Sequence, residues 1–522
     1  MPDAGSTPST QRPAGRQPIR TIFGALMLVM LLASLDQTIV STALPTIVGE
    51  FGGLAHLSWI VTAYLLATTI VTPLYGKLGD LFGRKIVLQS AIVLFLAGSA
   101  LCGLSRSMTQ LIVFRAVQGL GGGGLIVTAM AVVGDLISPR ERGKFQGVFG
   151  GVFGLSTVMG PLIGGFFVEQ LSWRWIFYVN LPLGLVALVI IGWAFSVPGA
   201  RRRPSIDIAG AGLLAATLTA LILLASLGGN TIAWTSPAAL SLAAGTLAAL
   251  AGFIVAEYVA AEPILPLRLF ANRVFAISCA VGFIVGFALF GSVTFMPMYL
   301  QVVKGLSPTH AGMMLTPMMA GVLITSISSG RIISRIGRYR PFPIAGTAIM
   351  TTGLALLATL GVATSTWTAC LYMIVLGLGL GLVMQVLVLA VQNAVDYRHL
   401  GVATSGTTLF RSIGGSVGVS LFGAIFTATL TSNLATALPA GSALPAATAP
   451  AAIQALPSAT RSLYLTAFTG ALHPVFLHAA VIAALGFALT WFLKEVPLRL
   501  SPAVPSGDPQ PVPSEPGPAA GV

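Results

Sequence analysis

GKLGDLFGRK at Gly76–Lys85 and GRIISRIGRY at Gly330–Tyr339 are two short stretches that echo each other along the chain. In both, a glycine is followed by a basic residue, and Gly-Arg comes seven residues after the first glycine. Each stretch separates two long apolar runs, so the echo predicts two related halves, with chance similarity of two basic loops as the alternative. Related halves arranged around a central site are typical of transporters.

The composition places the chain in a lipid bilayer. Charged residues are 8% and hydrophobic residues 55% of the 522 residues, and the mean hydropathy is +0.92. Soluble domains carry about 25% charged residues, so this chain cannot cover a water-exposed surface. It contains fourteen apolar runs, each of the roughly 20 residues that a transmembrane helix needs, which predicts an all-α integral membrane protein. The predicted spans are 20–46, 57–76, 85–104, 110–133, 145–168, 175–197, 208–227, 238–257, 274–299, 311–330, 342–361, 367–391, 402–428 and 473–494.

The positive charges follow the pattern of a membrane topology. Of the 27 Lys and Arg residues, 21 fall on one predicted side, 4 on the other and 2 inside spans. By the positive-inside rule the richer side is cytoplasmic, which puts both termini in the cytoplasm and the protein in the cell membrane. The formal net charge of +13 is therefore attributed to topology and not to nucleic-acid binding.

The spans divide the chain into two halves with an insertion between them. Residues 20–200 are expected to form an N-terminal six-helix half, 201–262 two inserted transmembrane helices, and 263–494 a C-terminal six-helix half. An Ala-, Pro-, Ser- and Thr-rich outer loop is expected at 431–470. The Pro-rich tails, 1–19 and 495–522, are expected to be disordered and cytoplasmic.

Asp36 is the one acidic residue of 14 that lies well inside a predicted span. At 1.5 Å per residue it lies about 24 Å along the helix from Arg20. An aspartate at the centre of a membrane helix costs about 2.5–3.5 kcal/mol, so we expect Asp36 to face a water-filled cavity and to act there. A change of surroundings would change the proton affinity of its carboxylate. The alternative is a permanent structural ion pair with Arg115.

Two arginines also lie inside predicted spans. Arg115, in the fourth span, is expected to hold an anionic partner, either Asp36 or a water chain leading to it. Anchoring of the helix is the alternative role. Arg411, in the thirteenth span, lies close enough to the inner end for its side chain to snorkel to the interface.

Two enzyme-like patterns fail on their context. GLGGGG at Gly119–Gly124 fits G-x-G-x-x-G, but no strand precedes it and no βαβ unit surrounds it. GGSVG at Gly414–Gly418 fits G-x-S-x-G, but it lies in a glycine-rich helix, and His473 or His478 would have to serve Ser416 as the base. The chain also lacks G-x-x-x-x-G-K-[ST] and any zinc-ligand spacing. We therefore expect no nucleotide, cofactor or metal, and an ion gradient as the energy source.

From about Leu35 to Leu421 the sequence resembles the drug:proton antiporter family with fourteen transmembrane helices, within the major facilitator superfamily. LDQTIVSTALP, which starts at Leu35, resembles the first-span signature of that family, with Ser41 in place of a frequent Asn. The resemblance implies that Asp36 takes part in proton coupling or cation recognition. It also implies supporting roles for Thr38 and Pro45.

GKLGDLFGRK resembles the family's loop between spans two and three. The resemblance implies that Gly76, Asp80, Gly83 and Arg84 help to control the conformational switch. Leu81 replaces a frequent Arg, so this chain departs from the full charge network of the family.

RAVQGLGGGG at Arg115–Gly124 resembles the fourth-span motif, whose arginine is implied to assist proton transfer. Gln118 and Gly119 of this motif are implied to support it, as is Arg411 of FRSIGGSVG at Phe410–Gly418, a stretch typical of the group. WRWIFYVNLPLG and MPMYLQVVKGLSPTHAG are two further typical stretches.

GPLIGG at Gly160–Gly165 resembles the fifth-span motif that is associated with antiporters. Ser156 stands where the family often has Gly, which is an exchange of one small residue for another. The motif residues implied to matter are Gly160, Pro161, Gly164 and Gly165. This motif favours export over import.

The resemblance implies a proton-coupled exporter of drug-like or other amphipathic small molecules, of the type involved in multidrug efflux and antibiotic resistance. Its partners would be protons, a small-molecule substrate and the lipid bilayer, without nucleic acid or nucleotide. Two alternatives stay open: a proton-coupled importer or exporter of a specific metabolite, and an intramembrane serine hydrolase. A family match does not carry a substrate with it.

Overall fold

The computed structural model describes residues 19–51, 57–194, 207–228, 232–437, 453 and 456–498. Within these ranges the chain is all-α, and its β-structure is limited to an isolated bridge between Gly228 and Ile232. Thirteen helices are long and apolar enough to cross a membrane, and a further apolar helix, Pro341–Leu357, is shorter. The predicted all-α fold with about fourteen membrane helices is confirmed for this part of the chain.

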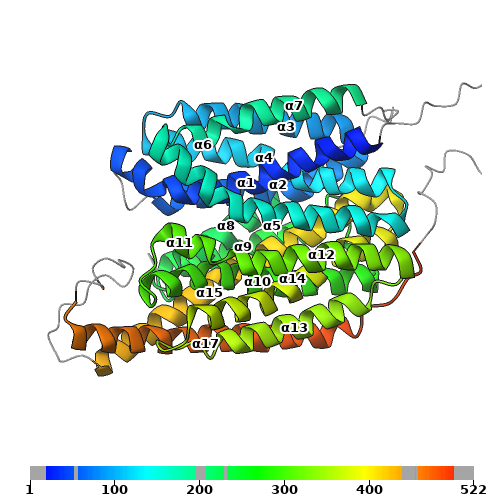
Figure 1. Cartoon of the computed structure of the whole chain (residues 1–522). Coiled ribbons are helices and arrows are strands. Elements are labelled where there is room, and N and C mark those ends of the chain that lie inside the picture. Colours follow the sequence, from blue (N-terminus) through cyan, green and yellow to red (C-terminus); the bar gives the residue numbers. More distant parts are fainter. Residues whose placement is uncertain are drawn as a thin grey trace, which may run out of the picture.

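The N-terminal helices form one layer of the bundle, drawn from blue to teal above the rest in Figure 1. They are α1 (Ile19–Phe51), α2 (Leu57–Phe82), α3 (Arg84–Gly103), α4 (Met108–Leu136), α5 (Pro139–Gln170), α6 (Trp175–Tyr178) and α7 (Asn180–Ala194). Leu26, Phe95 and Met130 belong to the buried cluster that packs α1, α3 and α4 together.

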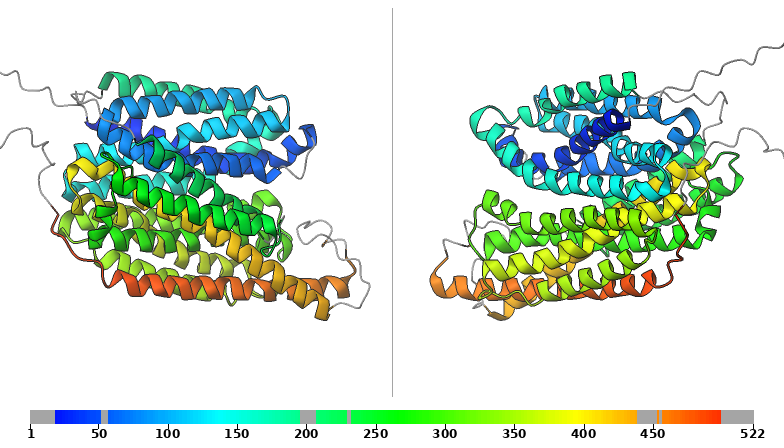
Figure 2. Two further views of the ribbon diagram at one scale, coloured as in Figure 1. Left: turned by 180° about the vertical axis from the view of Figure 1, so that it is seen from behind. Right: turned by 45° about the vertical axis from the view of Figure 1, so that its right-hand side comes forward.

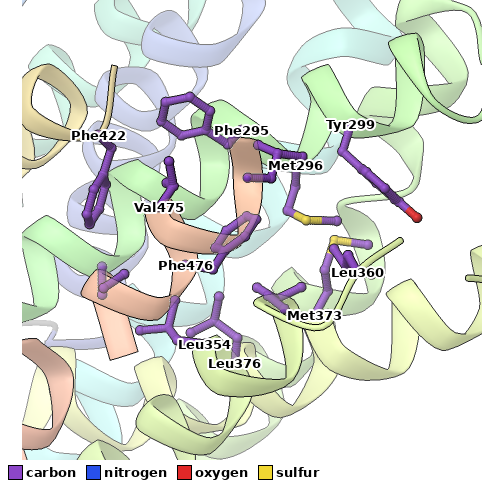
Figure 3. Packing of buried hydrophobic residues seen from close by; sticks show 14 of the residues in the cluster. Phe295, Met296, Tyr299, Leu354, Leu360, Met373, Leu376, Phe422, Val475 and Phe476 are labelled. Carbon is purple, nitrogen blue, oxygen red and sulfur yellow. The ribbon is translucent and has the colours of Figure 1, made fainter. Parts of the chain in front are cut away.

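The C-terminal helices form the second layer, drawn from green to red in Figure 1. They are α10 (Arg273–Val302), α11 (Pro308–Met313), α12 (Thr316–Ile336), α13 (Pro341–Leu357), α14 (Thr366–Ala394), α15 (Leu400–Ala437) and α17 (Ser458–Thr490), with the 3-10 turns η2 (Leu267–Ala271) and η3 (Tyr397–His399). Phe295, Phe422 and Phe476, from α10, α15 and α17, share a buried cluster with Leu354 and Leu376, and Figure 3 shows these residues in the core of this layer.

The inserted helices are α8 (Ile208–Leu227) and α9 (Pro237–Val259). In the left view of Figure 2 they run in green along the seam between the two layers, and α8 contacts both α2 and α15. Leu214 and Leu218 of α8 share a buried cluster with Val402 and Ala403 of α15. The insertion therefore covers the seam between α2 and α15.

The predicted boundaries near the C-terminus are wrong. Residues 431–437 continue α15 and residues 458–470 begin α17, so the outer loop expected at 431–470 is shorter, and the last span does not start at 473. Leu434 and Phe468 are buried in the core, and the alanines of this stretch favour helix. Packing therefore outweighs the Pro, Ser and Thr content. Residues 438–452 lie outside the described residues.

The C-terminal tail expected to be disordered from residue 495 has an ordered beginning. The Tyr339 hydroxyl donates to Lys494 O over 2.7 Å and accepts from Val496 N over 3.1 Å. Asn393 Nδ2 donates to Val496 O over 3.1 Å. Residues 1–18 and 499–522 of the expected tails lie outside the described part of the chain.

The two echoing stretches have the same local geometry. Gly83 and Gly337 both have positive φ, 93° and 74°, a conformation that favours glycine. A Cβ on Gly76 of α2 would lie 2.7 Å from Gly401 O of α15, and a Cβ on Gly330 of α12 would meet the backbone of Gly143 of α5. The first glycine of each stretch therefore lets a helix of one half touch a helix of the other.

Candidate functional site

Asp36 is enclosed by polar groups from three other helices of the N-terminal half. Its Oδ2 accepts a hydrogen bond from Arg115 Nη1 over 2.8 Å, and its Oδ1 accepts from Gln118 Nε2 over 2.7 Å and from Asn180 Nδ2 over 3.1 Å. The Ser99 hydroxyl accepts from the same two amides, over 2.7 and 3.2 Å. Every one of these side chains is buried, and Asp36 is 0% exposed.

Arg115 has partners on every side of its guanidinium. Besides Asp36, Nη1 donates to Gln118 Oε1 over 2.6 Å, and Nε donates to Ile60 O over 3.3 Å. The guanidinium carbon lies 4.1 Å from the centre of the Tyr64 ring and 5.8 Å from that of Phe177. Such cation–π contacts contribute most where they are desolvated. The buried arginine therefore keeps favourable contacts that do not involve the carboxylate.

The structure brings Asp36 and Arg115 together as the sequence predicted, but not on a cavity. The carboxylate does not face the expected water-filled cavity in this conformation, because it is 0% exposed and the partners that the described residues give it come from its own half. Removing one partner of such a buried pair costs about 3–5 kcal/mol. Both the coupling role and the permanent structural pair remain compatible with this geometry.

Helix α5 packs on α1 next to Asp36 through its glycines. A Cβ on Gly160 would collide with Thr38 Oγ1, and one on Gly164 would lie 2.8 Å from Ile39 O. The Thr38 hydroxyl donates across the same contact to Ser156 O, over 3.1 Å. Gly160 and Gly164 therefore allow close contact between the two helices.

The other predicted residues of this region have different positions. A Cβ on Gly165 would meet no heavy atom within 4 Å. Pro161 lies inside α5, where its ring faces Gly312 of α11. Gly119 packs against α2, because a Cβ there would lie 2.5 Å from Tyr64 O. Pro45 lies in α1, but its side chain is outside the described part of the structure.

Asp80 lies at the first turn of α15, a helix of the opposite half. Its Oδ1 accepts from Gly401 N over 3.0 Å and its Oδ2 from Val402 N over 2.9 Å. A carboxylate at a helix N-terminus binds free backbone amides and interacts favourably with the helix dipole. Arg84 donates to Asp80 and, over 3.0 Å, to Asp135 Oδ2. The charges of this loop thus hold α2 against α15.

A second set of contacts holds α5 against the C-terminal half at the same end of the bundle. Arg140 Nε donates to Ser334 O of α12 over 3.2 Å. Arg142 is buried, and its Nη1 donates to Gln392 O of α14 over 3.2 Å. This end of the bundle, which we call the Asp80 end, is therefore closed at both crossings between the halves.

The sequence analysis missed several residues of these sites: Ser99, Asn180, Asp135 and Arg142. Asn180 falls within WRWIFYVNLPLG, where a polar amide in an apolar run was the available signal. Ser99 carried no signal because hydroxyl side chains are common in membrane helices. Asp135 and Arg142 lie at helix ends, where a charge at the membrane surface needs no special explanation.

The residues of the hydrolase pattern do not meet. Ser416 Oγ donates to Ser412 O of its own helix over 3.2 Å. His473 Nε2 is 2.7 Å from Leu360 O, and His478 Nδ1 is 2.6 Å from Pro474 O. Gly414 of the pattern packs against the backbone of Phe283. In the described ranges, no three His, Cys, Asp or Glu side chains gather to hold a metal ion.

The family model described as Major Facilitator Superfamily matches residues 26–419 of the chain. The protein therefore belongs to the Major Facilitator Superfamily, as the motifs predicted, and it is a transporter of this superfamily.

Its relatives include named drug transporters. An uncharacterized MFS-type transporter of Mycobacterium tuberculosis is 44% identical over 503 residues, which cover 95% of this chain and 73% of the relative. Multidrug transporter protein MdtP of Bacillus subtilis is 42% identical over 79% of this chain and 76% of its own length. Multidrug resistance protein 3 of the same organism is 34% identical, with 78% and 80% covered.

Solved structures share the fold. The human organic anion transporter MFSD10 has a TM-score of 0.62 at 16% identity, covering 92% of this chain and 100% of that chain. The proton:xylose symporter XylE has a TM-score of 0.62 at 15% identity, with 91% and 96% covered. At these identities the likeness concerns the fold alone.

Proposed function

We propose that this protein exports drug-like or other amphipathic small molecules from the cytoplasm in exchange for protons. The names of the relatives at 42% and 34% identity support drug export, and the glycine–proline motif at Gly160–Gly165 supports antiport. The observation that carries proton coupling is the buried carboxylate of Asp36, which is paired with Arg115. The Asp80 end is assigned to the cytoplasm by the positive-inside rule.

The proposed cycle alternates access to a site between the two halves. In the conformation described, the Asp80 end is closed, so substrate would leave at the opposite end. Protonation of Asp36 removes its ion pair with Arg115, whose guanidinium keeps the Gln118 and Ile60 oxygens and the Tyr64 ring. The contact of α1 with α4 weakens while the charge of Arg115 stays solvated.

The change at Asp36 reaches the other half through α5. Thr38 lies two residues after Asp36 on α1 and is packed on Gly160 of α5. The same helix carries Arg140 and Gly143 at the Asp80 end, where they contact α12. A shift of α1 on α5 would therefore act on the α5–α12 crossing.

Transport in inverted vesicles tests the coupling assignment. With Asp36→Asn the shape of the side chain is kept and titration is lost, so uptake driven by a pH gradient should fall to the rate without a gradient. Glu50→Gln is the matched control because Glu50 lies on the same helix near its exposed end. Undiminished gradient-driven uptake by the Asp36 variant would defeat the assignment.

Uptake driven by a pH gradient in oriented vesicles decides the direction of transport. An exporter accumulates labelled substrate in inverted vesicles when the lumen is acidic. Accumulation only in right-side-out vesicles would instead support the proton-coupled importer. A panel of dyes and antibiotics in a strain without its own efflux systems separates a broad exporter from one for a specific metabolite.

A further inference from the structure

Arg411 differs from the other arginines in the interior of the bundle. Arg84 and Arg115 pair with carboxylates, and Arg142 donates to backbone carbonyls. Arg411, half-buried in the middle of α15, has no hydrogen bond or ion pair with any residue that the structure describes. Its side chain lines a cavity between α10, α14 and α15, and its reach to the membrane surface stays a prediction. A guanidinium at membrane depth calls for an anionic partner.

The cavity beside Arg411 contains a second polar group without a partner. The Ser278 hydroxyl of α10 is 0% exposed and lacks a hydrogen bond within the described chain. Ser278 and Arg411 line one cavity together with six further residues, namely Gly282, Val285, Met384, Leu387, Val388 and Thr407. Because buried polar groups are normally hydrogen-bonded, two unsatisfied donors in one cavity indicate a missing acceptor.

The packing of α10 on α15 fixes the two donors relative to each other. A Cβ on Gly286 of α10 would collide with the carbonyl oxygen of Arg411, and a Cβ on Gly414 of α15 would collide with that of Phe283. The two helix backbones are therefore in direct contact next to Arg411. Donors held by rigid elements bind an acceptor at a lower entropic cost.

The size and lining of the cavity limit what it can bind. The cavity is small: the space is about 250 Å³ even when its open mouth is counted, so it cannot enclose a whole drug-sized molecule. The remaining walls are mostly apolar. Val388 also belongs to the buried cluster of the N-terminal half, so the cavity lies beside the boundary between the halves. It suits the acidic end of an amphipathic molecule whose body extends along that boundary.

We propose that Arg411 and Ser278 form a binding site for the carboxylate group of the transported substrate. The guanidinium supplies the charge and two parallel N–H donors, which match a carboxylate, and the serine hydroxyl supplies a third donor. This proposal rests on the proposed export function and adds a substrate class to it, that of amphipathic carboxylates. A free inorganic anion such as chloride has the same charge and is the competing source of the acceptor.

Binding to the purified full-length protein tests the site. The probes are a fluorescent dye with one carboxylate and the methyl ester of the same dye. Wild type should bind the carboxylate about tenfold or more tightly than the ester, because hydrogen bonds to charged groups are the stronger ones. Arg411→Gln should abolish this preference without changing ester binding, and Arg411→Lys should retain part of it. Ser278→Ala should reduce the preference about threefold, the loss of one ordinary hydrogen bond.

Unchanged ester binding shows that a variant is folded, and Arg398→Gln, an exposed arginine outside the cavity, is the matched control. Equal affinities of wild type for the two dyes, or an Arg411→Gln variant that keeps the preference, would overturn the proposal. Chloride binding that depends on Arg411, combined with an intact preference for the carboxylate dye in Arg411→Gln, assigns the cavity to an inorganic anion and also overturns it.

Gradient-driven transport of the ester dye tests the export function independently of the proposed binding site at Arg411 and Ser278. If wild type moves neither dye, the proposed export function fails. If it moves the ester but shows no preference for the carboxylate that depends on Arg411, only the inference about the cavity fails.

Discussion

Lys77 Nζ lies 2.6 Å from Glu262 Oε2, and this ion pair joins the loop after the inserted helices to the end of α2. The loop is itself held by Glu257, whose carboxylate accepts from Ile264 N over 3.0 Å and from Leu265 N over 3.1 Å. Lys77 follows Gly76, the residue at which α2 touches α15. The inserted helices are thus linked to a crossing between the two halves.

Replacing either member of this pair should loosen that link. We expect Lys77→Gln and Glu262→Gln to lower stability by similar amounts, with a coupling energy of about 0.2–1 kcal/mol in a double-mutant cycle. The value is small because Glu262 is 45% exposed. Thermal unfolding in detergent measures it. The same cycle on Arg398 and Asp396, a fully surface pair, is the control and should give a smaller coupling. If the effects of the two substitutions were strictly additive, the ion pair of Lys77 and Glu262 would make no contribution to stability.

Asp80→Asn should slow turnover more than it weakens substrate binding. The charge of Asp80 at the first turn of α15 contributes about 0.3–1 kcal/mol through the helix dipole, and its loss affects only the conformation closed at the Asp80 end. Binding affinity and single-turnover transport, measured on the same preparation, separate the two effects. Weaker binding with normal turnover of bound substrate would contradict the switch role.

Arg115→Gln should destabilise the protein by about 3–5 kcal/mol, because Asp36 is left charged and buried without its cation. The double variant with Asp36→Asn should recover much of this loss, since it buries two neutral amides in place of one unpaired charge. Denaturation monitored by circular dichroism in detergent gives the comparison. A double variant as unstable as Arg115→Gln would mean that the arginine acts mainly through its contacts with Tyr64 and Ile60.

The contact between Gly143 and Gly330 should tolerate no side chain. An added methyl group at either position would meet the backbone of the partner helix, and such overpacking costs about 1–3 kcal/mol. We expect Gly143→Ala and Gly330→Ala to favour the conformation open at the Asp80 end, seen as a longer distance between spin labels at Lys144 and Arg331. Gly165→Ala, which meets open space on the same helix, should leave that distance unchanged.

Glu50 lies at the end of the bundle opposite Asp80, and it should make the stability of the protein depend on pH. Hydrogen bonds from Arg174 and Trp173 hold the pKa of Glu50 below its ordinary value of 4.5. The contribution of Glu50 to the free energy of unfolding is therefore complete above that value and is lost as the pH falls through the lowered pKa. The stability difference between wild type and Glu50→Gln should be largest near neutral pH and vanish in acid. A difference that grows on acidification would contradict the assignment.

The sequence predicts the charged parts of the sites better than the neutral ones. Asp36 and Arg115 were found because a charge inside a membrane span is costly, and two costly residues of opposite sign are expected to pair. Ser99 and Asn180 complete the network. Neutral polar side chains cost little free energy in a membrane helix, so these two gave no comparable signal. Asp80 was found through its loop motif, but which helix of the opposite half it meets is a matter of tertiary packing.

The placement of α8 and α9 and the start of α17 could not be predicted from the sequence. Helices α8 and α9 are apolar on all sides, so their pattern does not tell which face meets the bundle or where along it they lie. The first turns of α17 were hidden by the Pro-rich composition of the residues before Ser458. The positive φ at Gly83 and Gly337, in contrast, is the physical reason for the Gly-Arg pair that repeats in both stretches.

The place of the inserted helices also makes the protein asymmetric toward its lipid surroundings. Two similar halves would offer fat-soluble molecules two equivalent lateral routes, one along α2 and α15 and one along α5 and α12. The first route is occupied by α8, whereas Leu155, Met159 and Ile324 on the second have large exposed surfaces. Molecules dissolved in the hydrocarbon would then approach from one flank only, and a photoreactive lipid should label α5 and α12 in preference to α2 and α15.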